Sequence, residues 1–140
     1  MAESCSRYLF VNGSVVLLAG LISGIPMGVA IIRKKGEPKV RAWRVAHSTL
    51  IIDGLMMIIV GLVVPVLSLG KPVSWLVVWP LVISGYGFVM ALTVGAWKGY
   101  RGLTLKPYGM NTVLYAGHIV GASGSLVGIA ALIFGLFRAF

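Results

Sequence analysis

Acidic side chains are scarce in this chain. Three Asp and Glu residues stand against twelve Lys and Arg residues among 140, so the net charge at neutral pH is +9. In a soluble protein such a balance suggests nucleic-acid binding. Here the basic residues lie in the connections between long apolar runs, which is typical of membrane proteins. We therefore expect a membrane protein and no nucleic-acid partner.

Cysteine is nearly absent as well. The single cysteine, Cys5, excludes an intramolecular disulfide and a cysteine-based metal cluster. No stretch matches a nucleotide-binding loop, a metalloprotease helix or a serine-based triad. No polar segment is large enough to house a conventional soluble active site, so any chemistry must take place between apolar helices.

Apolar residues are abundant instead. They make up 59% of the chain, with a mean hydropathy of +1.00, and a soluble domain of this size could not bury so much apolar surface. Four runs reach the roughly 20 residues that a bilayer-crossing helix needs. The predicted spans are residues 8–32, 45–69, 73–97 and 112–137. The sequence thus predicts one all-α integral membrane domain over residues 1–140, a four-helix transmembrane bundle whose first run is a retained span.

Basic residues also predict the orientation. The first and third connections hold nine of them: Arg33, Lys34, Lys35, Lys39, Arg41, Arg44, Lys98, Arg101 and Lys106. The opposite side has Arg7, Lys71 and Arg138. Because cytoplasmic loops carry an excess of Lys and Arg, loops 33–44 and 98–111 are expected in the cytoplasm and both termini outside.

Two ionisable residues, His47 and Asp53, lie inside the second predicted span. Ionisable groups in hydrocarbon are costly and point to a functional site. His47 is either an interfacial side chain, a metal or haem ligand, or a proton carrier. Asp53 lies about 9 Å deeper and about 240° around the helix, so the two do not share a face. Asp53 is either a carboxyl bonded to a neighbouring helix or a neutral hydrogen-bond donor.

Other polar groups leave alternatives open. His118 lies at a depth similar to that of His47, so the two histidines could clamp a haem in an electron carrier. Arg101 is a topology charge, or it binds a haem propionate or a lipid phosphate. Glycines at four-residue spacing in the first and fourth helices indicate close helix packing, or a groove for a flat cofactor.

Three blocks of sequence carry a family resemblance. They are Arg7-Tyr8-Leu9 with Asn12-Gly13, Ala46-His47-Ser48 through Asp53-Gly54-Leu55-Met56-Met57, and Arg101-Gly102-Leu103-Thr104 followed by Tyr108-Gly109-Met110-Asn111. With these blocks the chain resembles the styrene oxide isomerase family of small four-span membrane enzymes, and more distantly the hydroxylaminobenzene mutases.

The resemblance implies a ferric haem b held between the subunits of a homotrimer in a bacterial inner membrane, with His47 as the axial ligand of the iron. The open iron position would act as a Lewis acid on the oxygen of a small apolar epoxide that partitions into the membrane lipid. Ring opening and a 1,2-hydride shift would then give the aldehyde, as from styrene oxide to phenylacetaldehyde. No net redox change occurs, so no reductant is needed.

The resemblance also assigns site residues, with two departures from the family pattern. Asp53 stands where the family usually has Asn, and Asn12 stands where relatives often have His. Tyr86 is the one tyrosine in the third predicted span and takes the place of the family's catalytic tyrosine. The expected catalytic residues are Asp53 and Tyr86, and the expected haem-binding residues are His47 and Arg101.

A second reading comes from another class of protein. Small multidrug-type transporters are also four-span chains of this length, and Asp53 would then be the proton-coupled carboxylate. Their essential carboxylate lies in the first helix, however, and the first predicted span has none.

Overall fold

The structure is a computed structural model that describes residues 2–67 and 69–139. It contains four long helices: α1 (Ala2–Ile32), α2 (Glu37–Val63), α3 (Lys71–Lys98) and α4 (Met110–Ala139). No strand occurs within the described residues. Each helix is long and apolar enough to cross a membrane. The predicted fold class, an all-α bundle of four apolar helices, is confirmed.

Proline and glycine explain where α2 begins and ends. The helix starts directly after Gly36, with Pro38 among its first residues, where proline is favoured because its missing N–H needs no partner. It ends at Val63, two residues before Pro65, which cannot continue a helical hydrogen-bond ladder. Both ends therefore lie closer to the N-terminus than the predicted span 45–69.

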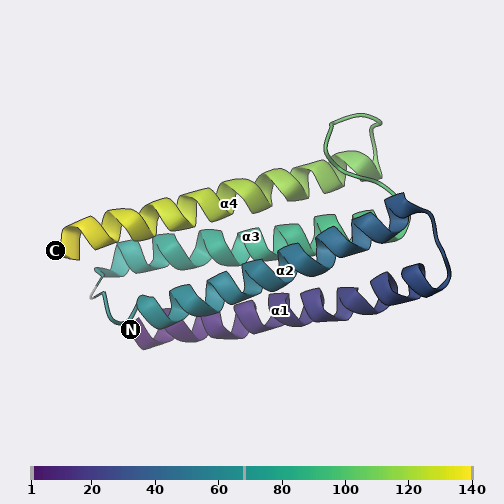
Figure 1. The fold of residues 1–140 in the computed structure, drawn as a ribbon. Helices are drawn as coiled ribbons and strands as arrows, with labels where there is room; N and C mark the ends of the chain where they lie inside the picture. The colour runs from purple at the N-terminus through teal and green to yellow at the C-terminus, as the bar shows by residue number, and fades with distance from the viewer. Residues whose placement is uncertain (1, 68, 140) are drawn as a thin grey trace.

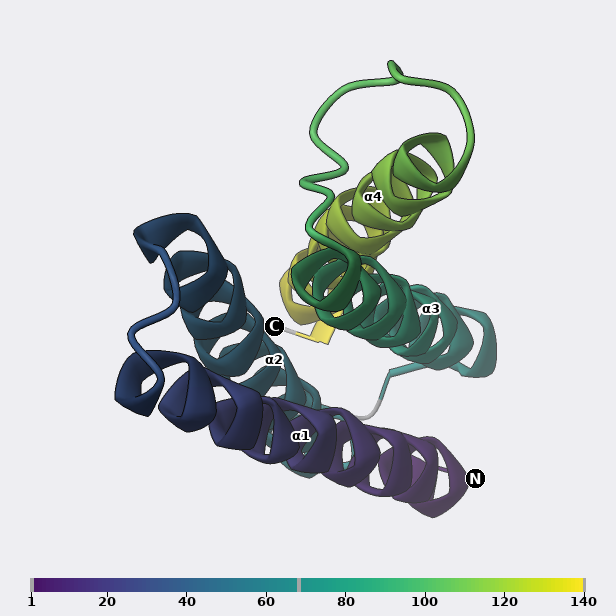
Figure 2. The same cartoon turned by 90° about the vertical axis from the view of Figure 1, so that its right-hand side faces the viewer.

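The helices form two antiparallel pairs. α1 packs along α2 and α3 packs along α4, while α3 also contacts both helices of the first pair (Figure 1). Among the described residues α4 contacts no helix except α3. Seen from the loop end, α2 and α4 stand apart on either side of α3 (Figure 2). Both predicted cytoplasmic loops lie at one end of the bundle and both termini lie at the other.

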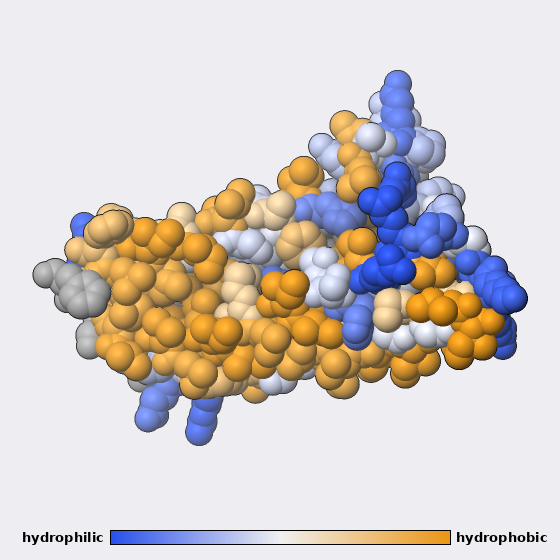
Figure 3. Space-filling model, viewed as in Figure 1, coloured by the Kyte–Doolittle hydropathy of each residue, from blue (hydrophilic) through white to orange (hydrophobic). Residues whose placement is uncertain are grey.

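The core lies where α1, α2 and α3 meet. Leu9, Leu50 and Leu81 are fully buried there. Large apolar side chains also cover the outside, with Ile52 67% and Leu126 73% exposed. Apolar residues cover most of the body, and hydrophilic residues gather toward the loop end (Figure 3). Such a surface is suited to hydrocarbon rather than to water.

The glycines of α4 serve helix packing. A Cβ atom placed on Gly124 would lie 2.6 Å from the carbonyl oxygen of Pro80, and one on Gly117 would lie 3.1 Å from the Cβ of Ala91. The hydroxyl of Ser84 donates to the carbonyl oxygen of Gly121 at 2.6 Å. Small residues here let the backbones of α3 and α4 approach closely. Of the two readings of these glycines, packing is confirmed.

Candidate functional site

His47 lies on the face of α2 that packs against α1. Its Nδ1 atom is 2.8 Å from the carbonyl oxygen of Gly20. Since a carbonyl oxygen only accepts, Nδ1 is the donor in this contact, and in a neutral imidazole Nε2 would then keep a free lone pair. A Cβ atom on Gly24 would lie 3.0 Å from His47 Cε1, so the half-buried ring needs a glycine beside it. Metal-ligating histidines are held in this way through their second nitrogen.

Asp53 turns away from His47 into the junction of α1, α2 and α3. Its side chain is 6% exposed. A Cβ atom on Gly85 of α3 would lie 3.4 Å from Asp53 Oδ2 and 2.9 Å from the side chain of Val16 on α1. Within the described part of the chain, Oδ2 has no hydrogen-bond partner. The prediction that His47 and Asp53 do not share one face of α2 is confirmed.

Tyr86 is held by the first helix. Its hydroxyl donates to Asn12 Oδ1 at 2.8 Å, and Asn12 Nδ2 donates to the carbonyl oxygen of Tyr8 at 2.7 Å. The Tyr8 ring contacts those of Trp75 and Trp79, at 5.6 and 6.0 Å between centroids. Tyr86 therefore belongs to a polar pair beside an aromatic cluster in the groove between α1 and α3. No pattern in the sequence links Asn12 to Tyr86, because only the packing of α1 against α3 brings them together.

The contacts of α1 with Tyr86 and with His47 are well separated. Asn12 holds Tyr86 and Gly20 holds His47, and eight residues of helix separate these two positions by about 12 Å along the axis. Within one chain, His47 and Tyr86 do not converge on one small molecule. A site that uses both needs a large ligand or contributions from two chains.

Arg101 and His118 lie in a different place. Both line a cavity of about 740 Å³ at the loop end, between the first turns of α2 and the last turns of α3. The ring of His118 packs near Phe88 of α3, with 6.4 Å between centroids. His47 does not line this cavity, because it faces α1. One chain therefore brings neither His118 nor Arg101 to His47.

Asn111 organises the connection between α3 and α4. Its buried amide accepts from the backbone N–H of Gly102 at 3.0 Å and donates to the carbonyl oxygens of Thr104 and Lys106 at 2.7 and 3.0 Å. These bonds join the two halves of the sequence block that starts at Arg101. Apart from its position in that block, nothing in the sequence indicates this role of Asn111.

The whole bundle matches a known family. A family model described as styrene oxide isomerase matches residues 5–137, which include most of all four helices. The chain belongs to the styrene oxide isomerase family. Comparison with curated proteins gives no match, and comparison with solved structures gives none either. The suspected resemblance is thereby confirmed, and membership of the styrene oxide isomerase family supports an isomerase function of that general type.

The residues of this styrene oxide isomerase family member can be compared with what a haem requires. No group of three His, Cys, Asp or Glu side chains that could hold a bare metal ion occurs within the described residues. A haem iron needs one axial imidazole from the protein. His47 is held through Nδ1, so its Nε2 atom could serve as such a ligand. The residues of the chain therefore fit a haem.

Proposed function

We propose that this protein is a membrane isomerase that holds ferric haem b through His47 and rearranges an aryl epoxide to an aldehyde. Styrene oxide to phenylacetaldehyde is the reaction type. The observation that carries the proposal is the contact of His47 Nδ1 with the Gly20 carbonyl oxygen in a chain of the styrene oxide isomerase family. When bound, ferric haem supplies a Lewis acid for the epoxide oxygen.

The reaction is an internal rearrangement. The benzylic C–O bond breaks, and a hydride moves from the terminal carbon to the benzylic carbon while the C=O bond forms. Every atom and electron of the substrate is kept in the product, so the chain needs to supply no reductant, water or second substrate. The protein's own contribution is to bind the apolar substrate, orient it and exclude water from the benzylic carbon.

Polar side chains provide the orientation in this proposal. The Tyr86 hydroxyl carries a proton that Asn12 Oδ1 accepts, and a substrate oxygen could take the place of that acceptor. Asp53 is the second proposed catalytic residue. In neutral form it would donate to the substrate oxygen, and in ionised form it would stabilise positive charge at the benzylic carbon.

We also propose that the active unit is a homotrimer. His47 and Tyr86 contact α1 about 12 Å apart along its axis, a spacing that is compatible with a site assembled from more than one chain. Arg101 lies away from His47 within a chain, so a role toward a haem propionate would require Arg101 of a neighbouring subunit. Loops 33–44 and 98–111 would face the cytoplasm of a bacterial inner membrane, with both termini outside.

The transporter alternative has less support. A proton-coupled carboxylate must meet water and substrate in turn, whereas Asp53 is 6% exposed at a three-helix junction. The family match also points to isomerase chemistry. The isomerase hypothesis therefore has more support than the transporter hypothesis.

Two measurements test the proposal. Protein purified from cells with ample haem should show a Soret band, and membranes that contain it should convert styrene oxide to phenylacetaldehyde. Membranes from cells without the gene provide the background. Protein without a Soret band would contradict the haem, and haem-loaded protein inactive on aryl epoxides would contradict the substrate class.

A further inference from the structure

The cavity at the loop end is lined by both charged and apolar residues. Three basic residues, Lys39, Arg41 and Arg101, and one acid, Glu37, line it together with the apolar Val45, Ala91 and Leu92. Its volume is about 740 Å³, which is in the range of sites for small organic ligands. This combination suits a ligand with an anionic head and an apolar body.

The cavity is separate from the His47 site. Val45 faces the cavity, and at 100° per residue His47 lies about 200° further around α2. His47 instead contacts Gly20 and packs against Gly24 on α1. Within one chain, a ligand in the cavity would therefore leave the His47 site free. At Arg101 such a ligand is an alternative to the haem propionate of a neighbouring subunit.

Arg41 and Arg101 form no ion pair within the described part of the chain. Glu37 is the one acid among the nine basic residues of the two loops, and the single ion pair there joins it to Arg44 at 3.8 Å. Lys39 is used within the fold, because its Nζ donates to the carbonyl oxygens of Ala96 and Trp97. Arg41 and Arg101 are both exposed and are therefore available to an anion from outside the chain.

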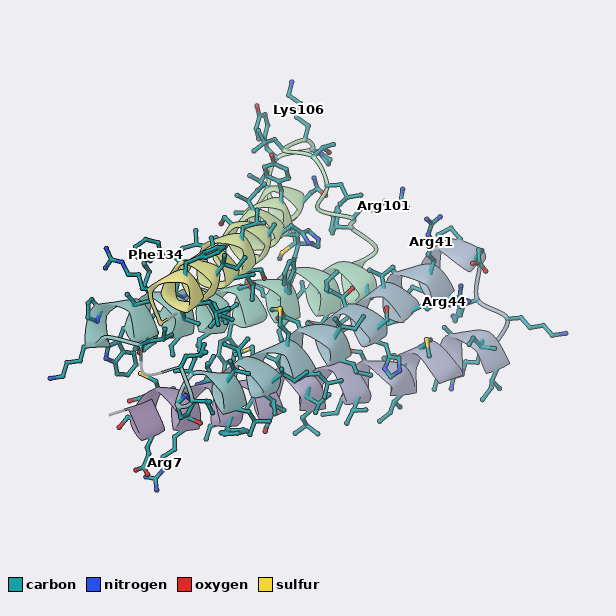
Figure 4. All side chains as sticks on the ribbon, turned by 60° about the vertical axis from the view of Figure 1, so that its left-hand side comes forward. Arg7, Arg41, Arg44, Arg101, Lys106 and Phe134 are labelled. Carbon is teal, nitrogen blue, oxygen red and sulfur yellow. The ribbon has the colours of Figure 1, made fainter. Side chains whose placement is uncertain are left out.

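The position of the cavity points to the source of that molecule. Arg41 and Arg101 lie at the loop end, on α2 and on the α3–α4 connection (Figure 4), where the apolar surface gives way to hydrophilic residues (Figure 3). The walls continue from Gly99 to Ala91, about 12 Å along α3. Within the described residues α2 and α4 make no contact with each other, and residues of both helices line the cavity.

We propose that this cavity binds an anionic phospholipid of the leaflet at the loop end. Arg41 and Arg101 face its phosphate, and the upper part of an acyl chain lies along Val45 and Leu92. Basic pockets between transmembrane helices are known to bind anionic head groups. The bound lipid would contact both the start of α2 and the α3–α4 connection and so stabilise their relative position. This structural role is separate from isomerisation.

Native mass spectrometry of the purified full-length protein tests this proposal. The probes are phosphatidylglycerol and phosphatidylcholine with the same acyl chains, each titrated in detergent. The test variant is Arg41→Gln/Arg101→Gln, and the matched control is Arg33→Gln/Lys35→Gln, which removes the same charge at the same end outside the cavity. A further variant, Val45→Trp, fills the apolar wall and leaves the charges in place.

The wild type should bind phosphatidylglycerol more tightly than phosphatidylcholine. The test variant should weaken phosphatidylglycerol binding by about thirtyfold, from two basic residues at about fivefold each, while the control keeps the preference. Val45→Trp should weaken binding of both lipids. Equal losses in test and control variants would overturn the proposal, as would displacement of the lipid by millimolar inorganic phosphate. If the test variant loses the Soret band but keeps its preference for phosphatidylglycerol, the arginines bind haem and not lipid. That result would also overturn the proposal.

Discussion

The Nδ1 atom of His47 lies 2.8 Å from the carbonyl oxygen of Gly20, across the contact between α2 and α1. This bond fixes which nitrogen carries the proton, and it leaves Nε2 available to an iron. The neighbouring Gly24 makes room for the ring. The backbone of α1 thus orients a histidine that lies within an apolar span of α2.

Replacing His47 by Ala should remove the haem. We expect the Soret absorbance per protein to fall at least about tenfold, because the axial ligand is lost. His118→Ala is the matched control, since His118 lies in the loop-end cavity, and it should keep the wild-type spectrum. Loss of haem in both variants would favour the bis-histidine electron carrier.

Gly24→Ala should weaken haem retention without touching the ligand itself. The new Cβ would lie 3.0 Å from His47 Cε1, so the ring must shift and haem affinity should fall by about tenfold. Gly28→Ala, one turn further along α1, meets nothing within 4 Å in the chain and should retain haem normally. Haem titration of the apoprotein measures both affinities. An equal loss in the two variants would instead indicate that α1 needs small residues for contacts between subunits.

Tyr86→Phe should reduce turnover more than it reduces haem content. The variant keeps the ring and removes the hydroxyl that donates to Asn12, and loss of a positioned proton donor typically costs about a hundredfold in rate. Tyr8→Phe is the control, because only the backbone oxygen of Tyr8 takes part in the Asn12 bond. Phenylacetaldehyde formation per haem is the measurement. Unchanged turnover in Tyr86→Phe would exclude Tyr86 as a catalytic residue.

Asp53→Asn should keep isomerase activity and stabilise the fold. The buried Oδ2 has no partner within the described residues, and an unpaired buried carboxylate costs more than an unpaired neutral amide. An amide has the same shape and carries no charge, and it restores the residue usual in the family. Thermal unfolding in detergent and the rate of epoxide rearrangement are the measurements. A lower midpoint, or activity lost while haem is retained, would show that the carboxyl group itself is required.

Asn111→Ala should loosen the α3–α4 connection. Three hydrogen bonds to the backbone of that connection depend on the Asn111 side chain, so we expect a loss of about 1–3 kcal/mol in the free energy of unfolding. Thr112→Ala, which removes a single exposed bond to Leu105, should cost less. Limited proteolysis of the connection and thermal unfolding give the comparison. Equal effects would mean that Asn111 is not what holds this loop.

The sequence by itself determined that there are four apolar spans, where the basic residues cluster and which family the chain belongs to, although the ends of α2 differ from the predicted span 45–69. These properties are local: about 20 apolar residues suffice for a span, and basic residues stand out between spans whatever the helices contact. Helical geometry also separated His47 from Asp53, because 100° per residue applies to any α-helix. The three sequence blocks that carry the family resemblance could be recognised because each is a short run of neighbouring residues.

Only the tertiary structure decided what each polar side chain meets. Asn12 and Tyr86 are 74 positions apart, and neither helix alone contains a signal for the other. The Gly20 carbonyl that holds His47 belongs to a backbone that looks the same at every residue until two helices pack. The cavity lined by Arg41 and Arg101 likewise exists because α2 and α4 both pack against α3 without contacting each other within the described residues. Such contacts depend on the relative placement of whole helices, which no local pattern of residues specifies.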